Sequence, residues 1–297
     1  MKFLLLGSEG QLGTALQKKL STLSIPFEYF SRKDLNIEDI GQIKKYLSGV
    51  DFDLVINCAA YTSVDAAENN TQAAFLANEI GSKNLAIYCN DYSKKLIHIS
   101  TDFVFDGNKN SPYAPSDITN PINIYGSSKL AGEKHIMELC SKYIIIRTSW
   151  VFGGKGNNFF STVCRLAKTS SPLSIIGDQF GSPTYVFDLA DAVIASASSL
   201  VTDKESKLES IYGIYHYAGS PECSWYDFAE YILNQGAIAK KLPHNFKLQK
   251  IKSSEFKTAA KRPQYSALDS SSFCNAFSCK PSNWKQGVDE LFFSEIL

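Results

Sequence analysis

The chain of 297 residues is 44% hydrophobic, 20% charged and 12% aromatic, which is the composition of a globular protein with a substantial core. Its thirty basic and thirty acidic residues leave no net charge, so no global field would draw the chain to nucleic acid or to an anionic membrane. Seven scattered cysteines without a C-x-x-C pair, and an opening apolar run too short for a signal peptide or a membrane span, predict a soluble cytoplasmic protein with reduced thiols and no metal site.

Short apolar or β-branched runs alternate with helical stretches over the first half of the chain. Strands are predicted at residues 2–6, 27–30, 53–57, 95–100 and 143–147. Helices are predicted at residues 11–22, 38–48, 70–90 and 126–141. This alternation predicts an α/β fold with a Rossmann-type, doubly wound parallel sheet that helices cover on both faces. In such sheets ligands bind beyond the carboxyl ends of the strands.

The first strand is followed by GSEGQLG, which contains Gly7, Gly10 and Gly13. Glycine permits a tight turn and lets backbone N–H groups approach a diphosphate at the positive end of the next helix. A glycine turn that only packs the strand on the helix is the alternative. The position at the first strand–helix junction favours cofactor binding.

The second strand is followed by SRKDLN. A carboxylate at this point is typical of NAD sites, whereas Ser31 and Arg32 suit the 2′-phosphate of NADPH. A solvated charge cluster is the alternative for Arg32 and Lys33. Tyr29 and Lys33 also form a Tyr-x-x-x-Lys pair, but Tyr29 lies in a predicted strand, so the two side chains do not share a helical face.

The third strand is followed by NCAAYTSVDAAE. The small residues Ala59 and Ala60 would let a ribose and a diphosphate pass close to the backbone, and Tyr61, Thr62 and Asp65 would supply polar contacts. The alternative is a small-residue turn before a helix that Thr62 or Asp65 caps, and both interpretations are compatible.

The fourth strand ends in STDFVFDG, so Ser100, Thr101 and Asp102 follow a buried segment. Alone, such a cluster is typical of a turn. About twenty residues later YGSSK places Tyr125 and Lys129 one turn apart at the start of a helix. Because this helix leads into the fifth strand, the pair and Thr101 are expected to meet at one edge of the sheet.

These three residues predict carbonyl–alcohol redox chemistry. A tyrosine titrates near a pKa of ~10 in water, and we expect the Lys129 ammonium to lower the pKa of Tyr125 and make it a better acid–base group. Lys129 is also expected to hydrogen-bond the nicotinamide ribose. Thr101 is expected to donate to a carbonyl oxygen as negative charge develops there.

Beyond residue 150 the alternation weakens into Pro- and Ser-rich turns such as SSPLSIIGDQFGSPTY. We therefore predict a dinucleotide-binding domain at residues 1–150, with returning segments at about 186–218. A smaller, discontinuous C-terminal substrate domain is predicted at residues 151–185 and 219–297.

Six ordered motifs resemble the dTDP-4-dehydrorhamnose reductases, a family of extended short-chain dehydrogenase/reductases: NCAAYTSVDAAE, STDFVFDG, PINIYGSSKLAGE, IIRTSWVFGGKGNNF, DQFGSPTY and KRPQYSALD. The resemblance covers nearly the whole chain. It implies reduction of the 4-keto group of dTDP-4-dehydro-L-rhamnose, a nucleotide-sugar substrate, by NADPH or NADH.

The resemblance also assigns residues to roles. The catalytic positions are Thr101, Tyr125 and Lys129. The cofactor positions are Gly10, Gln11, Leu12, Ser31, Asp34, Leu35, Ala60, Tyr61, Thr62 and Ile99. Asp102 and Trp150 fall on substrate positions, and Arg262 in KRPQYSALD is expected to contact the nucleotide-sugar phosphates.

Two other functions stay open. Dehydratases of the same superfamily carry Asp-Glu after the catalytic threonine, and Phe103 in place of that glutamate disfavours them, but an epimerase or another nucleotide-sugar 4-ketoreductase fits the same motifs. A non-catalytic NADP-binding subunit similar to the β-subunit of methionine adenosyltransferase is the second alternative.

Some relatives hold magnesium between subunits with glutamates. The matching positions here are Ala15, Phe187 and Lys285, which supply no oxygen ligand. We therefore expect a monomer or a metal-free homodimer.

Overall fold

The computed structural model describes residues 2–169, 172–202 and 210–294. Its main feature is a parallel sheet of six strands in the order β10-β5-β4-β3-β1-β2. The strands are β1 (Phe3–Leu6), β2 (Phe27–Phe30), β3 (Leu54–Asn57), β4 (Lys95–Thr101), β5 (Tyr143–Thr148) and β10 (Gly213–His216). The predicted fold class is confirmed, and all five predicted strands are present. The sixth strand, β10, was not predicted.

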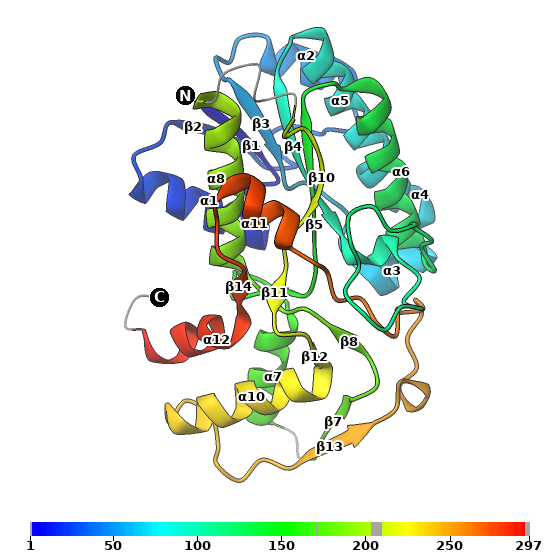
Figure 1. Cartoon of the computed structure of the whole chain (residues 1–297), viewed down its shortest axis with the longest axis vertical. Coiled ribbons are helices and arrows are strands. Elements are labelled where there is room, and N and C mark those ends of the chain that lie inside the picture. The colour runs from blue at the N-terminus through cyan, green and yellow to red at the C-terminus, as the bar shows by residue number, and fades with distance from the viewer. Residues whose placement is uncertain (1, 170–171, 203–209, 295–297) are drawn as a thin grey trace.

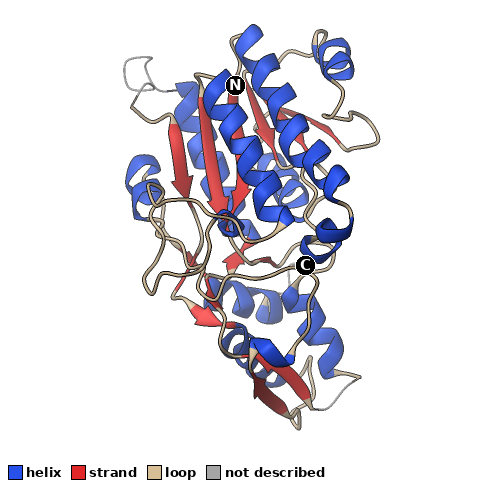
Figure 2. Cartoon of the chain, turned by 90° about the vertical axis from the view of Figure 1, so that its right-hand side faces the viewer, coloured by secondary structure: helices blue, strands red, loops and turns tan. Residues whose placement is uncertain are grey.

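Helices cover both faces of this sheet (Figures 1 and 2). One face carries α1 (Gln11–Thr22), α8 (Val186–Thr202) and α11 (Ser271–Phe277). The other face carries α2 (Ile40–Leu47), α5 (Gly81–Asp91) and α6 (Ile124–Leu139). Buried strands with helices on both sides are apolar throughout rather than alternating, which is why β1 reads as the continuous run FLLL.

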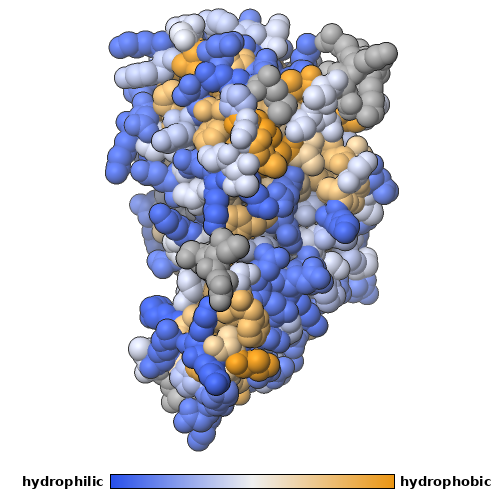
Figure 3. All heavy atoms as spheres, turned by 90° about the vertical axis from the view of Figure 1, so that its left-hand side faces the viewer, coloured by the Kyte–Doolittle hydropathy of each residue, from blue (hydrophilic) through white to orange (hydrophobic). Residues whose placement is uncertain are grey.

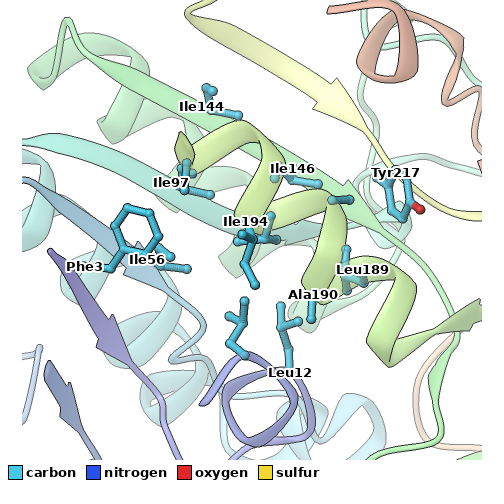
Figure 4. Packing of buried hydrophobic residues seen from close by; sticks show 14 of the residues in the cluster. Phe3, Leu12, Ile56, Ile97, Ile144, Ile146, Leu189, Ala190, Ile194 and Tyr217 are labelled. Carbon is cyan, nitrogen blue, oxygen red and sulfur yellow. The ribbon is translucent and has the colours of Figure 1, made fainter. Parts of the chain in front are cut away.

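Successive side chains of a strand pack into the cores on opposite faces of the sheet. Phe3 of β1 points to the α1–α8 face, where Ile56, Ile97 and Ile194 pack with it (Figure 4). The neighbouring Leu4 packs on the opposite face. This alternation is the consequence of the two-residue period of a strand.

The predicted helix at residues 70–90 is interrupted. It consists of α4 (Thr71–Phe75), a π-helical turn (Leu76–Ile80) and α5, and it follows the short α3 (Val64–Asn69). The π-helical turn carries the buried Asn78.

A second layer lies at one end of the sheet and has its own core of aromatic and aliphatic residues, among them Phe152, Phe228 and Trp284. Its helices are α7 (Phe159–Ala167), α10 (Trp225–Ile238) and α12 (Trp284–Phe293). Its strands are β6 (Val151–Phe152), β7 (Leu173–Ile176), β8 (Phe180–Gly181), β9 (Thr184–Tyr185), β11 (Gly219–Ser220), β12 (Cys223–Ser224), β13 (Leu248–Ile251) and β14 (Ser282–Asn283). These strands pair as β6–β9, β7–β13, β8–β12 and β11–β14.

Two 3₁₀ turns complete the secondary structure of the described residues. One lies at Asp102–Val104, directly after β4, and the other at Ser253–Glu255, after β13.

One segment departs from the predicted domain division. Helix α11 falls within residues 219–297, which were predicted to belong to the substrate domain. Its side chains Phe273 and Phe277 pack instead into the core beside α8. The boundary itself stays a prediction.

The surface on the side of α1 and α8 is mixed. Figure 3 shows hydrophilic residues around several small hydrophobic patches, as on most globular proteins. Within the described ranges, every helix is too short or too polar to serve as a membrane span.

Candidate active site

A cleft of about 620 Å³ opens beyond the carboxyl ends of the sheet strands. The chain runs from β1 outward to β2 and then returns across β1 to form β3. Such a reversal leaves a crevice between adjacent strand ends, which is where ligands bind in doubly wound sheets. The cleft is lined by residues that follow β1, β2, β3, β4 and β5.

The glycine loop forms the floor of the cleft. Gly7 has a φ of +77°, and a Cβ atom there would lie 2.5 Å from the backbone nitrogen of Ala59. A Cβ at Gly13 would lie 2.3 Å from the carbonyl oxygen of Gly7. Helix α1 begins at Gln11 directly after Gly10, so its free N–H groups lie beside the loop. All five predicted positions of this loop, Gly7, Gly10, Gln11, Leu12 and Gly13, line the cleft.

The turn after β2 is arranged differently from the prediction. Ser31, Arg32 and Leu35 line the cleft, but Asp34 does not. The Asp34 carboxylate accepts hydrogen bonds from the backbone N–H and the hydroxyl of Ser31 at 2.9 and 2.7 Å. These two hydrogen bonds hold the pKa of Asp34 below its usual value.

The carboxylate that does line this part of the cleft is Glu38, which was not predicted. It accepts a 2.9 Å hydrogen bond from Nη2 of Arg32. Arg32 is 71% exposed, whereas Glu38 is 17% exposed. In the sequence, the only sign of this pair is an acidic residue shortly after a basic one. That pattern does not predict that the acidic side chain faces the ligand.

The loop after β3 is hydrogen-bonded to the side chain of Asn78. The side chain of Asn78 accepts from the backbone N–H of Tyr61 at 2.8 Å and donates to its carbonyl oxygen at 3.1 Å. Ala59, Ala60 and Thr62 line the cleft, whereas Tyr61 does not.

Asp65, the alternative helix cap, has another partner. It accepts from the Arg262 guanidinium at 3.1 and 2.5 Å and from the backbone N–H of Ala260 at 3.1 Å. The hydrogen bond from Arg262 lowers the pKa of Asp65. Arg262 is not among the residues that line the cleft. The phosphate contact of Arg262 therefore stays a prediction.

Thr101, Tyr125 and Lys129 come together in the cleft. Thr101 is the last residue of β4, and the other two lie in the first turns of α6, which Asn123 caps through a 2.8 Å hydrogen bond to Gly126 N–H. A Cβ at Gly126 would lie 2.1 Å from the carbonyl oxygen of Phe103, so the glycine allows the helix to approach the end of β4. Ile99, on the same strand, also lines the cleft.

The expected electrostatic effect of Lys129 on Tyr125 is wrong for this structure. Burial raises the pKa of Tyr125 to about 12, and the adjacent Thr101 hydroxyl opposes this shift. The Lys129 Nζ instead donates to the carbonyl oxygen of Ile99 at 2.7 Å and lies 3.1 Å from Nε2 of His98. Burial also lowers the pKa of Lys129 to about 8. Tyr125 is therefore a protonated phenol, which suits it to donate a proton.

Asp102 and Trp150, the predicted substrate residues, also line the cleft. Asp102 is buried, which raises its pKa to about 6, and Thr101 donates a 3.0 Å hydrogen bond to its Oδ1. Trp150 follows β5 with a φ of 46°, and its ring stacks on Trp225, which was not predicted. This contact could not be predicted, because Trp225 lies far from the other site residues in the sequence.

A loop after β6 also reaches the cleft. Lys155 and Asn157 line it, and the side-chain amide of Asn158 donates a 2.8 Å hydrogen bond to Oε1 of Gln11. The motif GGKGNN, with a lysine between glycines, was the sequence signal for an anion-binding loop.

In the part of the chain that the structure describes, no three His, Cys, Asp or Glu side chains form a group that could hold a metal ion. Ala15 is buried in the α1–α8 contact, and Phe187 lies under the ammonium of Lys18.

Comparisons with known proteins agree with this geometry. A family model described as the RmlD substrate binding domain matches residues 1–295. The dTDP-4-dehydrorhamnose reductases of Aggregatibacter actinomycetemcomitans and Escherichia coli are 38% and 36% identical to the chain, over 98% of its length and 98% and 97% of theirs.

Solved structures show the same similarity. A dTDP-4-dehydrorhamnose reductase from Clostridium acetobutylicum matches with a TM-score of 0.89 at 35% identity. One from Bacillus anthracis, in complex with NADP, matches with a TM-score of 0.87 at 37% identity. Each match covers 98% of both chains. A UDP-galactose 4-epimerase with a TM-score of 0.76 at 16% identity shares the fold alone.

Proposed function

The chain belongs to the dTDP-4-dehydrorhamnose reductase family, and from this premise we propose that it reduces the 4-keto group of dTDP-4-dehydro-L-rhamnose to give dTDP-L-rhamnose, with NADPH as the reductant. The observation that carries the proposal is the meeting of Thr101, Tyr125 and Lys129 in the same cleft as the glycine loop.

The residues present fit NADPH. The glycine loop has no room for side chains at Gly7 and Gly13, and the free N–H groups at the start of α1 would bind the diphosphate. The Arg32 guanidinium would bind the 2′-phosphate, and Lys129 would bind the nicotinamide ribose. NADPH, when bound, supplies the hydride that reduces the carbonyl carbon.

The protein residues handle the proton and the charge. The Thr101 hydroxyl, turned from Oδ1 of Asp102 toward the substrate, would donate a hydrogen bond to the carbonyl oxygen, where negative charge develops during reduction. Tyr125, as a buried phenol, would give its proton to the same oxygen. Asp102 and Trp150 would orient the sugar on the side of the cleft opposite the cofactor.

We also propose that the enzyme is cytoplasmic and acts as a monomer or as a metal-free homodimer. The support is its balanced charge and its seven free thiols.

A second candidate is an epimerase, which the shared fold with UDP-galactose 4-epimerase keeps open. The high pKa of Tyr125 favours the reductase, because a phenol that starts protonated suits net reduction. A non-catalytic NADP-binding subunit is the third candidate.

The test is NADPH oxidation with dTDP-4-keto-6-deoxyhexoses, followed by NMR of the product. We expect stoichiometric NADPH oxidation and dTDP-L-rhamnose as the product. Enzyme that is purified with bound cofactor and causes no net oxidation would support the epimerase instead. No oxidation with any 4-ketosugar nucleotide, together with tight binding to another enzyme, would support the regulatory subunit.

A further inference from the structure

A buried chain of hydrogen bonds ends at Lys129. The backbone N–H of Ala59 donates to Oδ1 of Asn57 at 3.0 Å, and Nδ2 of Asn57 lies 3.0 Å from Nδ1 of His98. Nε2 of His98 lies 3.1 Å from Nζ of Lys129, which donates to the carbonyl oxygen of Ile99 at 2.7 Å. Asn57 and His98 are cross-strand partners on β3 and β4.

The direction of this chain follows from its first member. A backbone N–H can only donate, so Oδ1 of Asn57 must face Ala59 and the amide NH₂ must face His98. Nδ1 of His98 is therefore an acceptor. A neutral imidazole with Nδ1 as the acceptor carries its proton on Nε2, which is the atom beside Lys129.

The imidazole is held in the neutral state. His98 is fully buried, and burial lowers its pKa well below the usual value. Because Nε2–H is a donor, Nζ of Lys129 must accept the hydrogen bond. A neutral amine has a lone pair for this purpose, and an ammonium has none.

We propose that His98 is a positioning residue that donates its Nε2 proton to Nζ of Lys129 and so stabilises the neutral amine of Lys129 in the free enzyme. Burial lowers the pKa of Lys129 to about 8, so the neutral amine predominates above that pH.

Two other titratable groups near Lys129 favour its charged form. Glu133 on α6 and Cys58 after β3 both raise the pKa of Lys129. The Glu133 carboxylate is already paired with Arg147 at 2.7 Å. The pKa of the Cys58 thiol is raised to about 12 by burial, so it carries no charge near neutrality. Tyr125, on the same helix, is neutral as well.

The use that the enzyme would make of a neutral Lys129 rests on the proposed reductase function. Each reduction removes the phenolic proton of Tyr125 to the product hydroxyl, and water must replace that proton. An ordinary lysine, with a pKa near ~10.4, stays charged at neutral pH. A lysine with a pKa near neutrality can take up and release a proton during turnover.

The first test needs no substrate. Nitrogen-15 NMR of histidine-labelled enzyme reports which ring nitrogen carries the proton, and His98 is assigned as the signal that His98→Gln lacks. We expect a neutral imidazole with the proton on Nε2 above about pH 8, where the amine of Lys129 is neutral. A proton on Nδ1, or a doubly protonated ring near neutrality, would overturn the proposal.

The second test uses Asn57→Asp to reverse the direction of the hydrogen bonds between residue 57, His98 and Lys129. The carboxylate still accepts from Ala59 N–H, but its other oxygen now accepts from Nδ1 of His98. The ring proton should move to Nδ1, and Nε2 should become an acceptor that stabilises the ammonium of Lys129. The alkaline limb of kcat/KM, which reports groups of the free enzyme, should then move up by about one pH unit or more.

The control is Asn90→Asp, the same chemical change at an exposed position on α5. It should leave both the tautomer and the pH profile of the wild type unchanged. A flipped tautomer with an unmoved alkaline limb would remove His98 from its role toward Lys129. If the wild type reduces no 4-ketosugar nucleotide, the proposed function fails, and the NMR result still decides the direction of the chain.

Discussion

The indole ring of Trp150 lies flat against that of Trp225, with ring centroids 3.3 Å apart and an interplanar angle of 6°. The contact joins the end of β5 to the first residue of α10, and so connects the main sheet to the second layer. Trp150 has a φ of 46°, which a bulky residue adopts only where its surroundings hold it. Gly181 leaves room for the ring, since a Cβ there would lie 2.5 Å from it.

We predict that Trp225→Ala raises the KM for the nucleotide sugar by about tenfold and changes kcat less, because Trp150 loses its support. Steady-state kinetics at saturating NADPH measure both constants. Trp225→Phe keeps an aromatic face and should stay near wild type. An unchanged KM in the alanine variant would show that Trp150 needs no support from Trp225.

We predict that Tyr125→Phe lowers turnover by about two to four orders of magnitude and leaves NADPH affinity largely intact, because only the proton donor is lost. Turnover and cofactor titration separate the two effects. The control Tyr29→Phe should behave as wild type, since Tyr29 is exposed on β2, outside the cleft. Near-normal turnover in Tyr125→Phe would end its assignment as the proton donor.

We predict that NADPH is used at least as well as NADH, and that Arg32→Ala erodes this preference. The matched variant is Glu38→Gln, which removes the carboxylate that pairs with Arg32. It should tighten NADPH binding and leave NADH binding nearly unchanged, because only the 2′-phosphate competes for the guanidinium. Dissociation constants of both cofactors test this. A wild type that prefers NADH would contradict the assignment of Arg32.

We predict a specific pH dependence of stability from Lys129. Its pKa falls from 10.5 to about 8 on folding, so between these values the unfolded chain binds more protons than the native protein. Stability from this group therefore rises as the pH rises through that window. Compared with Lys129→Met, the wild type should gain about 2 kcal/mol of unfolding free energy between pH ~7.5 and pH ~10. Urea denaturation of both proteins at the two pH values measures the gain, and a constant difference would contradict the lowered pKa.

We predict that the enzyme needs no divalent metal, because the positions expected to match the glutamates of metal-bridged relatives are Ala15, Phe187 and Lys285. Magnesium demands several oxygen donors, and these side chains supply none. Sedimentation and activity with and without EDTA should therefore be the same. Dissociation of a dimer by EDTA, or activity that magnesium restores, would mean that these positions are misaligned.

The sequence by itself determined five of the six strands of the sheet, the glycine loop and the three residues of the proposed catalytic centre. Apolar runs and helical periods are local properties, so β1 to β5 and α1 could be predicted from them. Because parallel strands share one carboxyl edge, Gly7, Thr101 and Tyr125 could also be placed together without coordinates.

Only the tertiary structure decided which partner each polar side chain takes. Lys129 pairs with His98 rather than with Tyr125, and Arg262 pairs with Asp65. These partners lie 31 and 197 residues apart, respectively. Such contacts depend on the packing of whole elements, and burial then sets the pKa values of the groups involved. Local sequence patterns predict neither the partner of a polar side chain nor its pKa.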